Sequence, residues 1–318
     1  MNVLVTGGAG FIGSNLVRAL LDRGDAVRVL DNFATGSRTN LAEIHPVSAD
    51  RLSVIEGDIR DQETCRDACR GVEVVYHQAA LGSVPRSIED PSTTDAVNIH
   101  GTVNIFSAAR EAGVRRVVYA SSSSVYGDEP SLPKVEGRIG RPLSPYALTK
   151  LTNERYADLF SSLYGMTLVG LRYFNIFGPR QSPDGPYAAV IPRFIQALLS
   201  KEAATINGDG EQSRDFTYVA NAVQANLKAA SAELPAGHHV FNVACGERFT
   251  LNELHRILSG MVESPVLPVH GPARPGDVRH SQADITAIQE RLGYLPETDM
   301  EEGLRRTLDW FRMGSRPA

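Results

Sequence analysis

Apolar residues in the first half of the chain fall into short, nearly continuous runs that alternate with longer segments of helical periodicity. The runs predict strands at Val3–Thr6, Ala26–Asp31, Leu52–Glu56, Val74–Gln78, Arg116–Ser121 and Thr167–Tyr173. The segments between them predict helices near Phe11–Arg23, Gln62–Arg70, Thr94–Ala112 and Pro145–Tyr164. Strands that are apolar throughout, with helices between them, are typical of a parallel sheet covered on both faces. The pattern therefore predicts an α/β protein with a doubly wound parallel sheet.

This alternation ends after about Asn175. Beyond a loop at 178–186 that is rich in glycine and proline, the expected elements are a helix at Ile191–Ser200, a strand at Thr205–Gly208, a helix from Asn221, a strand at His239–Val243, a loop at Pro265–Gly276 and a helix from about Glu301 to Arg312. The sequence shows no flexible linker or repeat. We therefore expect two domains with a cleft between them. Residues 1–175 form the doubly wound domain, to which later segments return, and residues 176–318 form a smaller α/β lobe.

The composition narrows the class of protein. Of the 318 residues, 42% are hydrophobic and 22% are charged, and the formal net charge is −5. These values are typical of a soluble globular protein and argue against nucleic acid or a membrane surface as a partner. No apolar run is long enough for a membrane span, and the N-terminus enters a strand without an export signal, so we expect a cytoplasmic protein. The three cysteines and eight histidines show no metal-ligand spacing, and no metal site is expected.

A glycine fingerprint, Gly7-x-x-Gly10-x-x-Gly13, follows the first strand and opens the first helix. In this context glycine allows a tight turn, a close approach of the backbone to a pyrophosphate, and close packing of the helix on the strand. The amino end of the helix offers amide groups and positive potential to phosphates. The motif therefore predicts a dinucleotide cofactor bound by a Rossmann domain.

Two acidic residues end the next two strands, and they bear on which dinucleotide binds. Asp31 ends the second strand, where a carboxylate can bind the ribose hydroxyls of adenosine. The same carboxylate would repel a 2′-phosphate, so NAD is favoured over NADP. Asp58 ends the third strand and is expected to contact adenine, although an Asx-turn that only shapes the loop is the alternative.

Tyr146 and Lys150 are four residues apart on a predicted helix, so they share one face of it. A lysine ammonium close to the phenol favours the phenolate and lowers the tyrosine pKa, which makes tyrosine a usable base near neutral pH. Four serines, from Ser121 to Ser124, follow the fifth strand at its carboxyl end, where open α/β sheets bind ligands. They could hold a substrate hydroxyl near the Tyr146 oxygen, or they could simply end the strand.

Along essentially its whole length, the sequence resembles the extended short-chain dehydrogenases/reductases, and among them the nucleotide-sugar 4-epimerases. The resemblance rests on motifs in the family's order: the glycine fingerprint, Asp31, Gly57-Asp58, His77-Gln78-Ala79-Ala80, Asn98, the serine run, Tyr146-x-x-x-Lys150 and Arg172-Tyr173-Phe174-Asn175. It implies that Ser122, Tyr146 and Lys150 are the catalytic residues. It also implies that NAD contacts Gly7, Gly10, Phe11, Ile12, Gly13, Asp31, Asn32, Asp58, Ile59, Gln78, Ala79, Ala80, Asn98, Tyr146, Lys150 and Tyr173.

The resemblance further implies that the C-terminal lobe holds the UDP part of a nucleotide sugar. Arginine forks suit a pyrophosphate and a carboxylate suits a ribose, which agrees with such a role for Arg214, Arg274 and Asp277. The implied substrate contacts are Ser83, Ser122, Ser123, Tyr146, Asn175, Gln181, Ala189, Val190, Asn207, Arg214, Arg274, Asp277 and Ser281.

The sugar itself is implied by a smaller set of positions. Ser281 stands where epimerases restricted to plain hexoses resemble one another in carrying a tyrosine, and a serine leaves room for an N-acetyl group at C2. The segments 82–87 and 179–190 resemble the branch that prefers UDP-N-acetylglucosamine and UDP-N-acetylgalactosamine. Relatives that act on glucuronate carry an arginine near Ser182, which is uncharged here, although Arg180 is close.

The resemblance thus implies an isomerase that interconverts these two UDP-sugars through a transient 4-keto sugar and recycles NAD, with UDP-glucose and UDP-galactose as further candidate substrates. The alternatives are a UDP-glucose 4-epimerase without N-acetyl preference and a UDP-glucuronate 4-epimerase. Related dehydratases and decarboxylases carry an acid where this chain has Ser123-Ser124, and serine cannot replace that carboxylate. A reductase and a non-catalytic NAD-binding protein are further alternatives. A homodimer that pairs through Thr94–Ala112 and Pro145–Tyr164 is expected by analogy.

Overall fold

A seven-stranded sheet forms the centre of the protein, whose computed structural model describes residues 1–42, 50–184, 188–272 and 278–314. Its strands lie in the order β11-β6-β5-β4-β1-β2-β3, and each pairs in parallel with its neighbours. They are β1 (Asn2–Thr6), β2 (Ala26–Asp31), β3 (Leu52–Glu56), β4 (Val74–His77), β5 (Arg116–Ser122), β6 (Leu168–Tyr173) and β11 (His238–Val243). The predicted α/β fold with a doubly wound parallel sheet is confirmed. Because the strand order reverses between β1 and β4, a ligand crevice is expected at the carboxyl ends of these strands.

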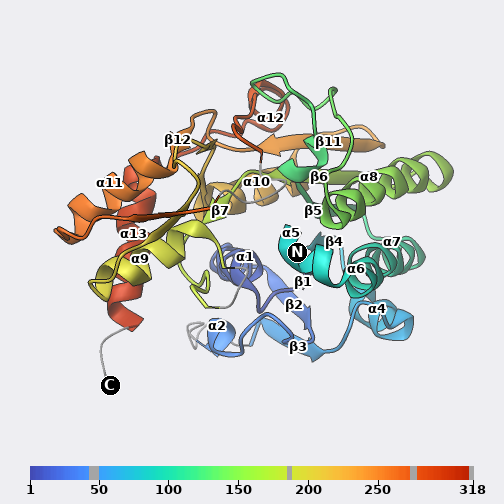
Figure 1. Ribbon diagram of the computed structural model, residues 1–318. Coiled ribbons are helices and arrows are strands. Elements are labelled where there is room, and N and C mark those ends of the chain that lie inside the picture. The colour runs from blue at the N-terminus through green and yellow to red at the C-terminus, as the bar shows by residue number, and fades with distance from the viewer. Residues whose placement is uncertain (43–49, 185–187, 273–277, 315–318) are drawn as a thin grey trace.

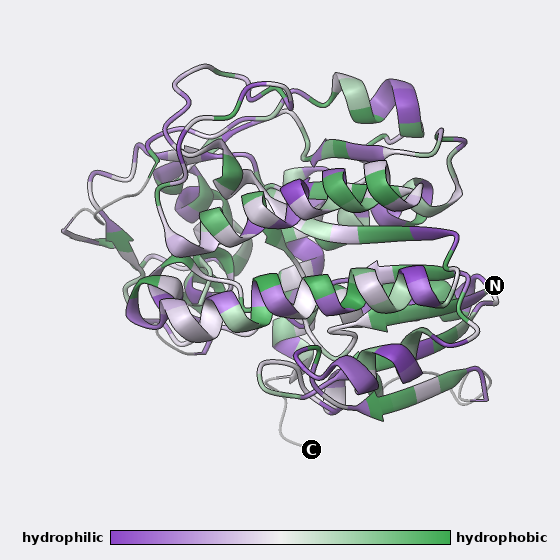
Figure 2. Cartoon of the chain, turned by 90° about the vertical axis from the view of Figure 1, so that its right-hand side faces the viewer, coloured by the Kyte–Doolittle hydropathy of each residue, from purple (hydrophilic) through white to green (hydrophobic). Residues whose placement is uncertain are grey.

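Helices cover both faces of this sheet (Figure 1). One face packs against α1 (Phe11–Asp22), α10 (Val219–Ser231) and α12 (Thr286–Leu292). The other face packs against α4 (Gln62–Cys69), α7 (Gly101–Glu111) and α8 (Pro145–Tyr164). The strands are therefore apolar on both sides, whereas the helices alternate apolar and polar residues, as the colours in Figure 2 show.

The chain beyond residue 175 is divided between the two halves of the molecule. β11, α10 and α12 join the central sheet, and the other segments form a second lobe, on the left in Figure 1. That lobe contains α9 (Val190–Leu199), α11 (Leu251–Val262) and α13 (Met300–Gly314). It also contains three pairs of short strands: β7 (Ile176–Phe177) with β10 (Thr217–Tyr218), β8 (Thr205–Asn207) with β13 (Val269–Gly271), and β9 (Ser213–Arg214) with β12 (Phe249–Thr250). The lobe has its own apolar core, while the domain boundary at residue 175 stays a prediction.

Helix α8 is defined at both ends by residues that the sequence makes recognisable. The Ser144 hydroxyl accepts a hydrogen bond from the Ala147 amide (3.1 Å), and Pro145 occupies the first turn. At the other end Gly165 adopts the left-handed conformation, with φ 67°, which glycine tolerates without strain. These boundaries match the predicted helix.

Several elements differ from the sequence-based prediction. The helix expected over Thr94–Ala112 is broken into α6 (Pro91–Asp95), a π-helical turn at Ala96–His100, and α7. Helices α5 (Val84–Glu89), α11 and α12 are additional to the expected elements. A signal existed for α11, because Thr250 and Glu253 form a capping box at its start. The short helix α2 (Thr39–Ala42) and a 3-10 turn at Ser123–Tyr126 complete the connections.

Candidate active site

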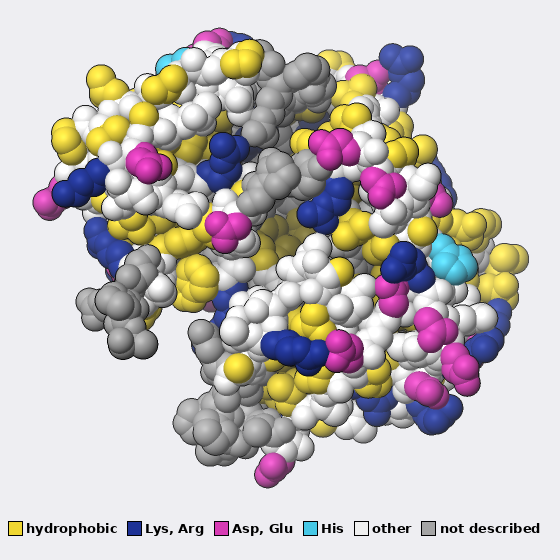
Figure 3. Space-filling view, turned by 60° about the horizontal axis from the view of Figure 1, so that its bottom comes forward, with side chains coloured by type: hydrophobic (Ala, Val, Ile, Leu, Met, Phe, Trp, Pro, Cys, Tyr) yellow, Lys and Arg dark blue, Asp and Glu magenta, His cyan; other side chains and the backbone are white. Residues whose placement is uncertain are grey.

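A cavity of about 660 Å³ lies at the carboxyl ends of the central strands. It opens where the surface is hollowed between the two halves of the molecule (Figure 3). Of the residues predicted to contact NAD, those that line this cavity are Gly7, Gly10, Phe11, Ile12, Gly13, Asp31, Asn32, Asp58, Ile59, Gln78, Ala79, Ala80, Tyr146, Lys150 and Tyr173. The strand ends thus bring together side chains from segments that span more than half of the chain.

Asn98 is the exception, because it lies behind the cavity wall and is fully buried. Its Oδ1 accepts a hydrogen bond from the Leu81 amide (2.8 Å), and its Nδ2 donates to the Leu81 carbonyl (3.1 Å). Asn98 therefore fixes the segment that leaves β4 and does not itself line the cavity.

The glycine fingerprint forms a tight cradle at one side of the cavity. A Cβ on Gly13 would lie 2.0 Å from the Gly7 carbonyl oxygen, and a Cβ on Gly7 would lie 2.7 Å from the Ala79 backbone. Gly10 is the N-cap residue of α1, and no side chain caps the helix there. The first turn of α1 carries no acidic residue. The amides at the start of α1 are thus available to an anion, which fits the pyrophosphate of a dinucleotide.

Asp31 and Asp58 are held in place by different partners. Asp31 is 7% exposed, and its two carboxylate oxygens accept hydrogen bonds from the Ala9 and Phe33 amides (both 2.8 Å). Asp58 accepts hydrogen bonds from the Arg60 guanidinium (3.0 and 2.8 Å) and from the side-chain Nδ2 of Asn32 (2.8 Å). The hydrogen bonds from Arg60 hold the pKa of Asp58 at about 2. Both carboxylates line the cavity, where a ribose and a base can meet them.

The serine run and helix α8 meet on the opposite side of the cavity. The Ser122 hydroxyl oxygen accepts hydrogen bonds from the amide (3.1 Å) and hydroxyl (2.9 Å) of Ser124. Its own hydrogen can therefore be donated to Tyr146 or to a ligand hydroxyl. The Lys150 ammonium donates to the Ala120 carbonyl (2.9 Å) and lies 5.9 Å from the centre of the Tyr146 ring. The structure thus brings the three predicted catalytic residues, Ser122, Tyr146 and Lys150, into one cluster.

One electrostatic expectation for this cluster is wrong. Burial raises the pKa of Tyr146 above its ordinary value, and the hydrogen bond with Ser122 acts in the opposite direction. Lys150, whose ammonium lies 5.9 Å from the centre of the Tyr146 ring, is not among the causes that shift this pKa. Burial also lowers the pKa of Lys150 to about 8. Burial is thus the largest cause of the pKa shift of each group.

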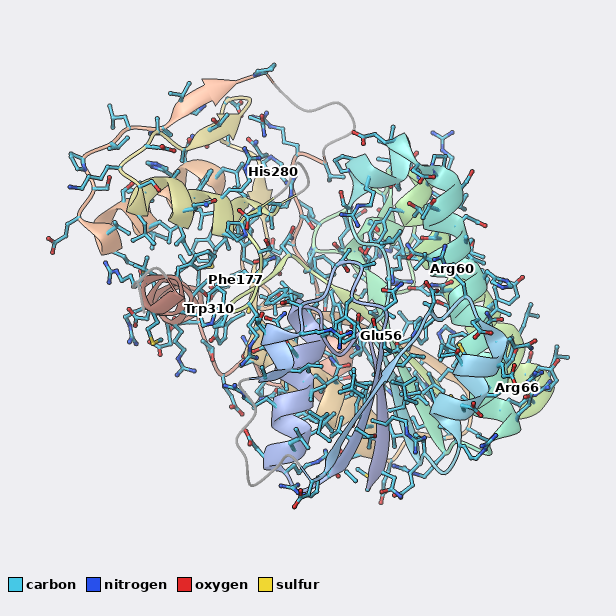
Figure 4. All side chains as sticks on the ribbon, turned by 90° about the horizontal axis from the view of Figure 1, so that it is seen from below. Glu56, Arg60, Arg66, Phe177, His280 and Trp310 are labelled. Carbon is cyan, nitrogen blue, oxygen red and sulfur yellow. The ribbon has the colours of Figure 1, made fainter. Side chains whose placement is uncertain are left out.

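A second cavity of about 290 Å³ continues from the first into the other lobe. Ser83, Asn175, Ile176 and Gln181 line both cavities, so the two adjoin. The second cavity is also lined by the predicted substrate residues Ala189, Val190, Asn207 and Arg214. Figure 4 labels Glu56 and Arg60 in the half that holds the first cavity, and Phe177, His280 and Trp310 in the other half.

Comparison with known proteins shows which family the chain belongs to. Residues 3–244 match the NAD dependent epimerase/dehydratase family. The chain is also 40% identical to the UDP-glucose 4-epimerase of Mycolicibacterium smegmatis, over 99% of this chain and 100% of that relative. The chain belongs to the NAD-dependent epimerase/dehydratase family. The predicted family, the cofactor NAD and the assignment as an isomerase are confirmed.

Solved structures of related epimerases superpose closely on this protein. The UDP-N-acetylglucosamine 4-epimerase from Methanobrevibacter ruminantium, in complex with UDP-N-acetylmuramic acid, has a TM-score of 0.93 at 40% identity and covers 98% of both chains. The UDP-glucose 4-epimerase of Thermus thermophilus, in complex with NAD, has a TM-score of 0.88 at 36% identity, over 98% of this chain and 99% of that one. The first of these two epimerases is named for UDP-N-acetylglucosamine and the second for UDP-glucose.

The remaining predicted substrate residues of this epimerase-family protein have other positions. Ser123 and Ser281 do not line either cavity, and Arg274 and Asp277 lie outside the described residues. The Ser281 amide donates to the Ser213 carbonyl (3.0 Å), which places Ser281 beside the strand that carries Arg214. The roles of these four residues stay predictions.

Two of the six described non-glycine residues with a positive φ, Ser83 and Asn175, lie where the two cavities join. Ser83 has a φ of 106° and Asn175 a φ of 39°, values that residues with a side chain rarely adopt. Such strain persists only where the surrounding structure enforces it, and it is often found at functional sites. The unusual backbone geometry at this junction therefore agrees with a functional role for it.

Three residues that line the second cavity were not predicted as site residues from the sequence. Arg193, Gln212 and Phe216 line the second cavity. A weak signal existed for Arg193, because it follows the predicted contact Val190 by three residues at the start of α9 and so shares its face. The described residues contain no group of three or more histidines, cysteines and acids that could hold a metal ion. None of the described helices is long and apolar enough to cross a membrane.

Proposed function

We propose that the protein is a UDP-sugar 4-epimerase that interconverts UDP-N-acetylglucosamine and UDP-N-acetylgalactosamine and also acts on UDP-glucose and UDP-galactose. The observation that carries the proposal is the cluster of Ser122, Tyr146 and Lys150 in the cofactor cavity, which adjoins a second cavity lined by Arg214. The relatives act on UDP-sugars according to their names, which supports the same substrate class here.

The chemistry assigned to the cluster is a reversible oxidation at C4 of the sugar. NAD, when bound, supplies the hydride acceptor. Tyr146 takes the proton of the C4 hydroxyl as that carbon is oxidised and returns it when the carbon is reduced. Ser122 donates a hydrogen bond to the same oxygen, and Lys150 keeps a positive charge beside the phenol. The 4-keto sugar turns over inside the cavity before reduction, so that the configuration at C4 is inverted.

The second cavity has the task of holding the nucleotide while the sugar turns. Arg214 on β9, together with Arg274 and Asp277, is proposed to bind the UDP moiety, and Ala189 and Val190 provide an apolar wall at the start of α9. Binding energy from a distant, non-reacting part of the substrate can position the sugar without fixing its orientation. A tether at UDP therefore permits rotation while preventing release.

Epimerisation is favoured over dehydration or decarboxylation by the acids in the cavities. Among the described residues, the carboxylates that line either cavity are Asp31 and Asp58, both at the end expected to hold adenosine. The described surroundings of Tyr146 in the cavities therefore hold no second carboxylate of the kind that the related dehydratases and decarboxylases carry.

The alternative substrate UDP-glucuronate has less support. The Arg180 guanidinium, which is close in sequence to the position where glucuronate-acting relatives carry an arginine, donates to Asn15 Oδ1 on α1 (3.3 Å). Arg180 is 9% exposed and lines neither cavity. It is therefore directed into the protein and away from the place where a sugar carboxylate would lie.

The proposed N-acetyl preference rests mainly on Ser281. If a small side chain there leaves room for the acetyl group, replacing Ser281 with tyrosine lowers kcat/KM for UDP-N-acetylglucosamine relative to UDP-glucose by about tenfold or more, or about 1.4 kcal/mol. Ser281→Ala keeps the ratio within about twofold, since it removes no space. An unchanged ratio in the tyrosine variant would remove the basis for the preference.

A second copy of the chain is the proposed partner, and α8 the proposed contact. Leu148, Leu159 and Leu163 are 53%, 53% and 67% exposed and recur along α8 at helical spacing. An apolar stripe on a surface helix is typical of an interface. Light scattering of the wild type should give the mass of a dimer, and Leu159→Arg should give that of a monomer. A monomeric wild type would contradict this assignment.

The function is tested by incubating the purified protein, without added reductant, with UDP-N-acetylglucosamine and separately with UDP-glucose. Products are resolved by anion-exchange chromatography and identified by proton NMR. Formation of the C4 epimers without a net release of NADH is the expected result. If neither sugar gives an epimer, the proposal fails, and UDP-glucuronate is the next substrate to test.

A further inference from the structure

Helix α8 is connected to the end of β5 at three successive turns. Tyr146 interacts with Ser122, Lys150 Nζ donates to the Ala120 carbonyl (2.9 Å), and Glu154 Oε1 accepts a hydrogen bond from Ser121 Oγ (2.6 Å). Residues 146, 150 and 154 share one face of the helix because they are four residues apart. The first two contacts belong to the catalytic cluster, and the third has been given no role so far.

The third contact is part of a buried ionic network. Glu154 Oε1 also accepts from Arg172 Nε (2.9 Å), and Glu154 Oε2 accepts from Arg172 Nη2 (2.8 Å). Arg172 on β6 is the register partner of Ser121 on β5, so one carboxylate joins α8, β5 and β6. Ser121, Glu154 and Arg172 are 2%, 4% and 3% exposed. All three elements carry residues of the cavity lining, namely Ser122, Tyr146 with Lys150, and Tyr173.

We propose that Glu154 is a positioning residue for the reaction. Through Ser121 it sets the separation between Ser122 at the end of β5 and Tyr146 on α8, and Arg172 holds its carboxylate in the required orientation. Glu154 itself lines neither cavity, so it acts on the sugar only through the residues that it joins.

The energetics favour positioning over stability as the reason for this network. Removing two charges from water costs free energy that their attraction often fails to recover, so a buried ion pair is a poor source of stability. What such a pair supplies is a fixed geometry, since a bidentate arginine and carboxylate permit one arrangement. A displacement of reacting groups by about 1 Å can cost about 100-fold in rate, so a fixed geometry matters here.

The test uses Ser121→Ala, which removes the contact between Glu154 and β5 and leaves the ion pair of Glu154 and Arg172 intact. We expect kcat to fall by about 10- to 100-fold while KM changes by less than about threefold. The melting temperature should stay close to that of the wild type. Ser121→Thr restores the hydroxyl donor and should recover most of kcat. Ser162→Ala on the exposed side of α8 is the matched control and should leave all three quantities unchanged.

Three outcomes would overturn the proposal. A lower melting temperature with an unchanged kcat would show that the network is structural. A higher KM with an unchanged kcat would show that Ser121, which lines the cavity, binds the substrate directly. Failure of the threonine variant to recover kcat would show that the hydrogen bond to Glu154 is not what matters. Glu154→Gln leaves the Arg172 charge unpaired and can impair folding, so the serine variants decide the question.

Discussion

The two adjoining cavities of this epimerase-family protein are built in different ways. Around the cofactor cavity, polar side chains are fixed by nearby backbone, as Asp31 is by the Ala9 and Phe33 amides. Around the substrate cavity, contacts join loops that are far apart in the chain: Asn175 Nδ2, for example, donates to the Asp215 carbonyl (3.0 Å). The first cavity is therefore lined mainly by strand ends of one sheet, where Gln78 and Tyr173 are also joined to Asn226 on α10. The second cavity exists only when the second lobe has folded against the sheet.

The largest effect is expected from removing the proposed base, Tyr146, which lines the cofactor cavity. Tyr146→Phe should lower kcat by about 1,000-fold or more, at the upper part of the range for a general acid or base. The dissociation constants of NAD and of the UDP-sugar should stay within about twofold of the wild-type values, because neither cavity loses its lining. Kinetics and isothermal titration measure the two effects separately.

The matched control for Tyr146→Phe is Tyr164→Phe, near the end of the same helix. Tyr164 is 49% exposed, and its ring contacts Phe160 and Arg110 outside the cavities. The kcat of the Tyr164→Phe variant should equal that of the wild type. Substantial activity in Tyr146→Phe would contradict the assignment of the base.

The glycine fingerprint lines the cofactor cavity and not the substrate cavity, so a substitution there tests the first cavity alone. Gly13→Ala places a Cβ against the Gly7 carbonyl, a contact that neither backbone can relieve cheaply. We expect NAD affinity to be lost and the protein to be destabilised by about 1–3 kcal/mol. NAD titration and thermal unfolding measure these losses.

Gly260→Ala is the corresponding control, because a Cβ at that helical position meets no atom within 4 Å. Alanine favours helix over glycine by up to about 1 kcal/mol, so this variant should be slightly more stable than the wild type. Normal NAD binding in Gly13→Ala would show that the cradle is less crowded than its geometry indicates.

The substrate cavity is tested at Arg214. Arg214→Ala should raise KM for the UDP-sugar by about 10- to 100-fold, the loss expected for charge-assisted hydrogen bonds worth about 1.5–3 kcal/mol. NAD affinity should not change, since Arg214 does not line the cofactor cavity. Arg256→Ala, at an exposed position on α11, is the control. Equal losses of NAD and UDP-sugar affinity would mean that the two cavities are not independent.

A smaller effect is expected from pH. Burial lowers the pKa of Lys150 to about 8, so the ammonium is present below that pH and is lost as the pH rises through it. If the charge beside Tyr146 is required, kcat should fall by about tenfold per pH unit above about 8. The same shift means that the buried ammonium lowers folding stability below about pH 8, and that this penalty is relieved toward higher pH. A kcat that stays constant to about pH 9.5 would exclude the requirement for the ammonium.

Much of the cofactor half could be predicted from the sequence because its signals are local. The fingerprint from Gly7 to Gly13, the acid at Asp31 and the pair Tyr146 and Lys150 each lie on one strand end or one helix, and periodicity places them. The exceptions have physical causes. Asn98 lies in a π-helical turn and bonds to the Leu81 backbone behind the cavity wall, and no sequence pattern marks such a turn.

Contacts between separate elements are less predictable, in the cofactor half as well, because no local pattern marks them. Glu154 can be assigned to the same helical face as Lys150, but its partners Ser121 and Arg172 come from two other strands. The spacing of Lys150 also predicts the wrong direction for the pKa of Tyr146, since burial cannot be judged from spacing alone. Motifs indicate which residues take part, and the packing decides what charge and geometry they have.

The most direct test of the central claim is to follow the hydrogen at C4. UDP-N-acetylglucosamine labelled with deuterium at C4 is incubated with the enzyme, and the product is examined by proton NMR and mass spectrometry. The account predicts UDP-N-acetylgalactosamine that retains deuterium at C4, because the hydride leaves and returns within one closed site. Deuterium lost to solvent, or found at C6, would contradict epimerisation through a 4-keto sugar at the Tyr146 cluster.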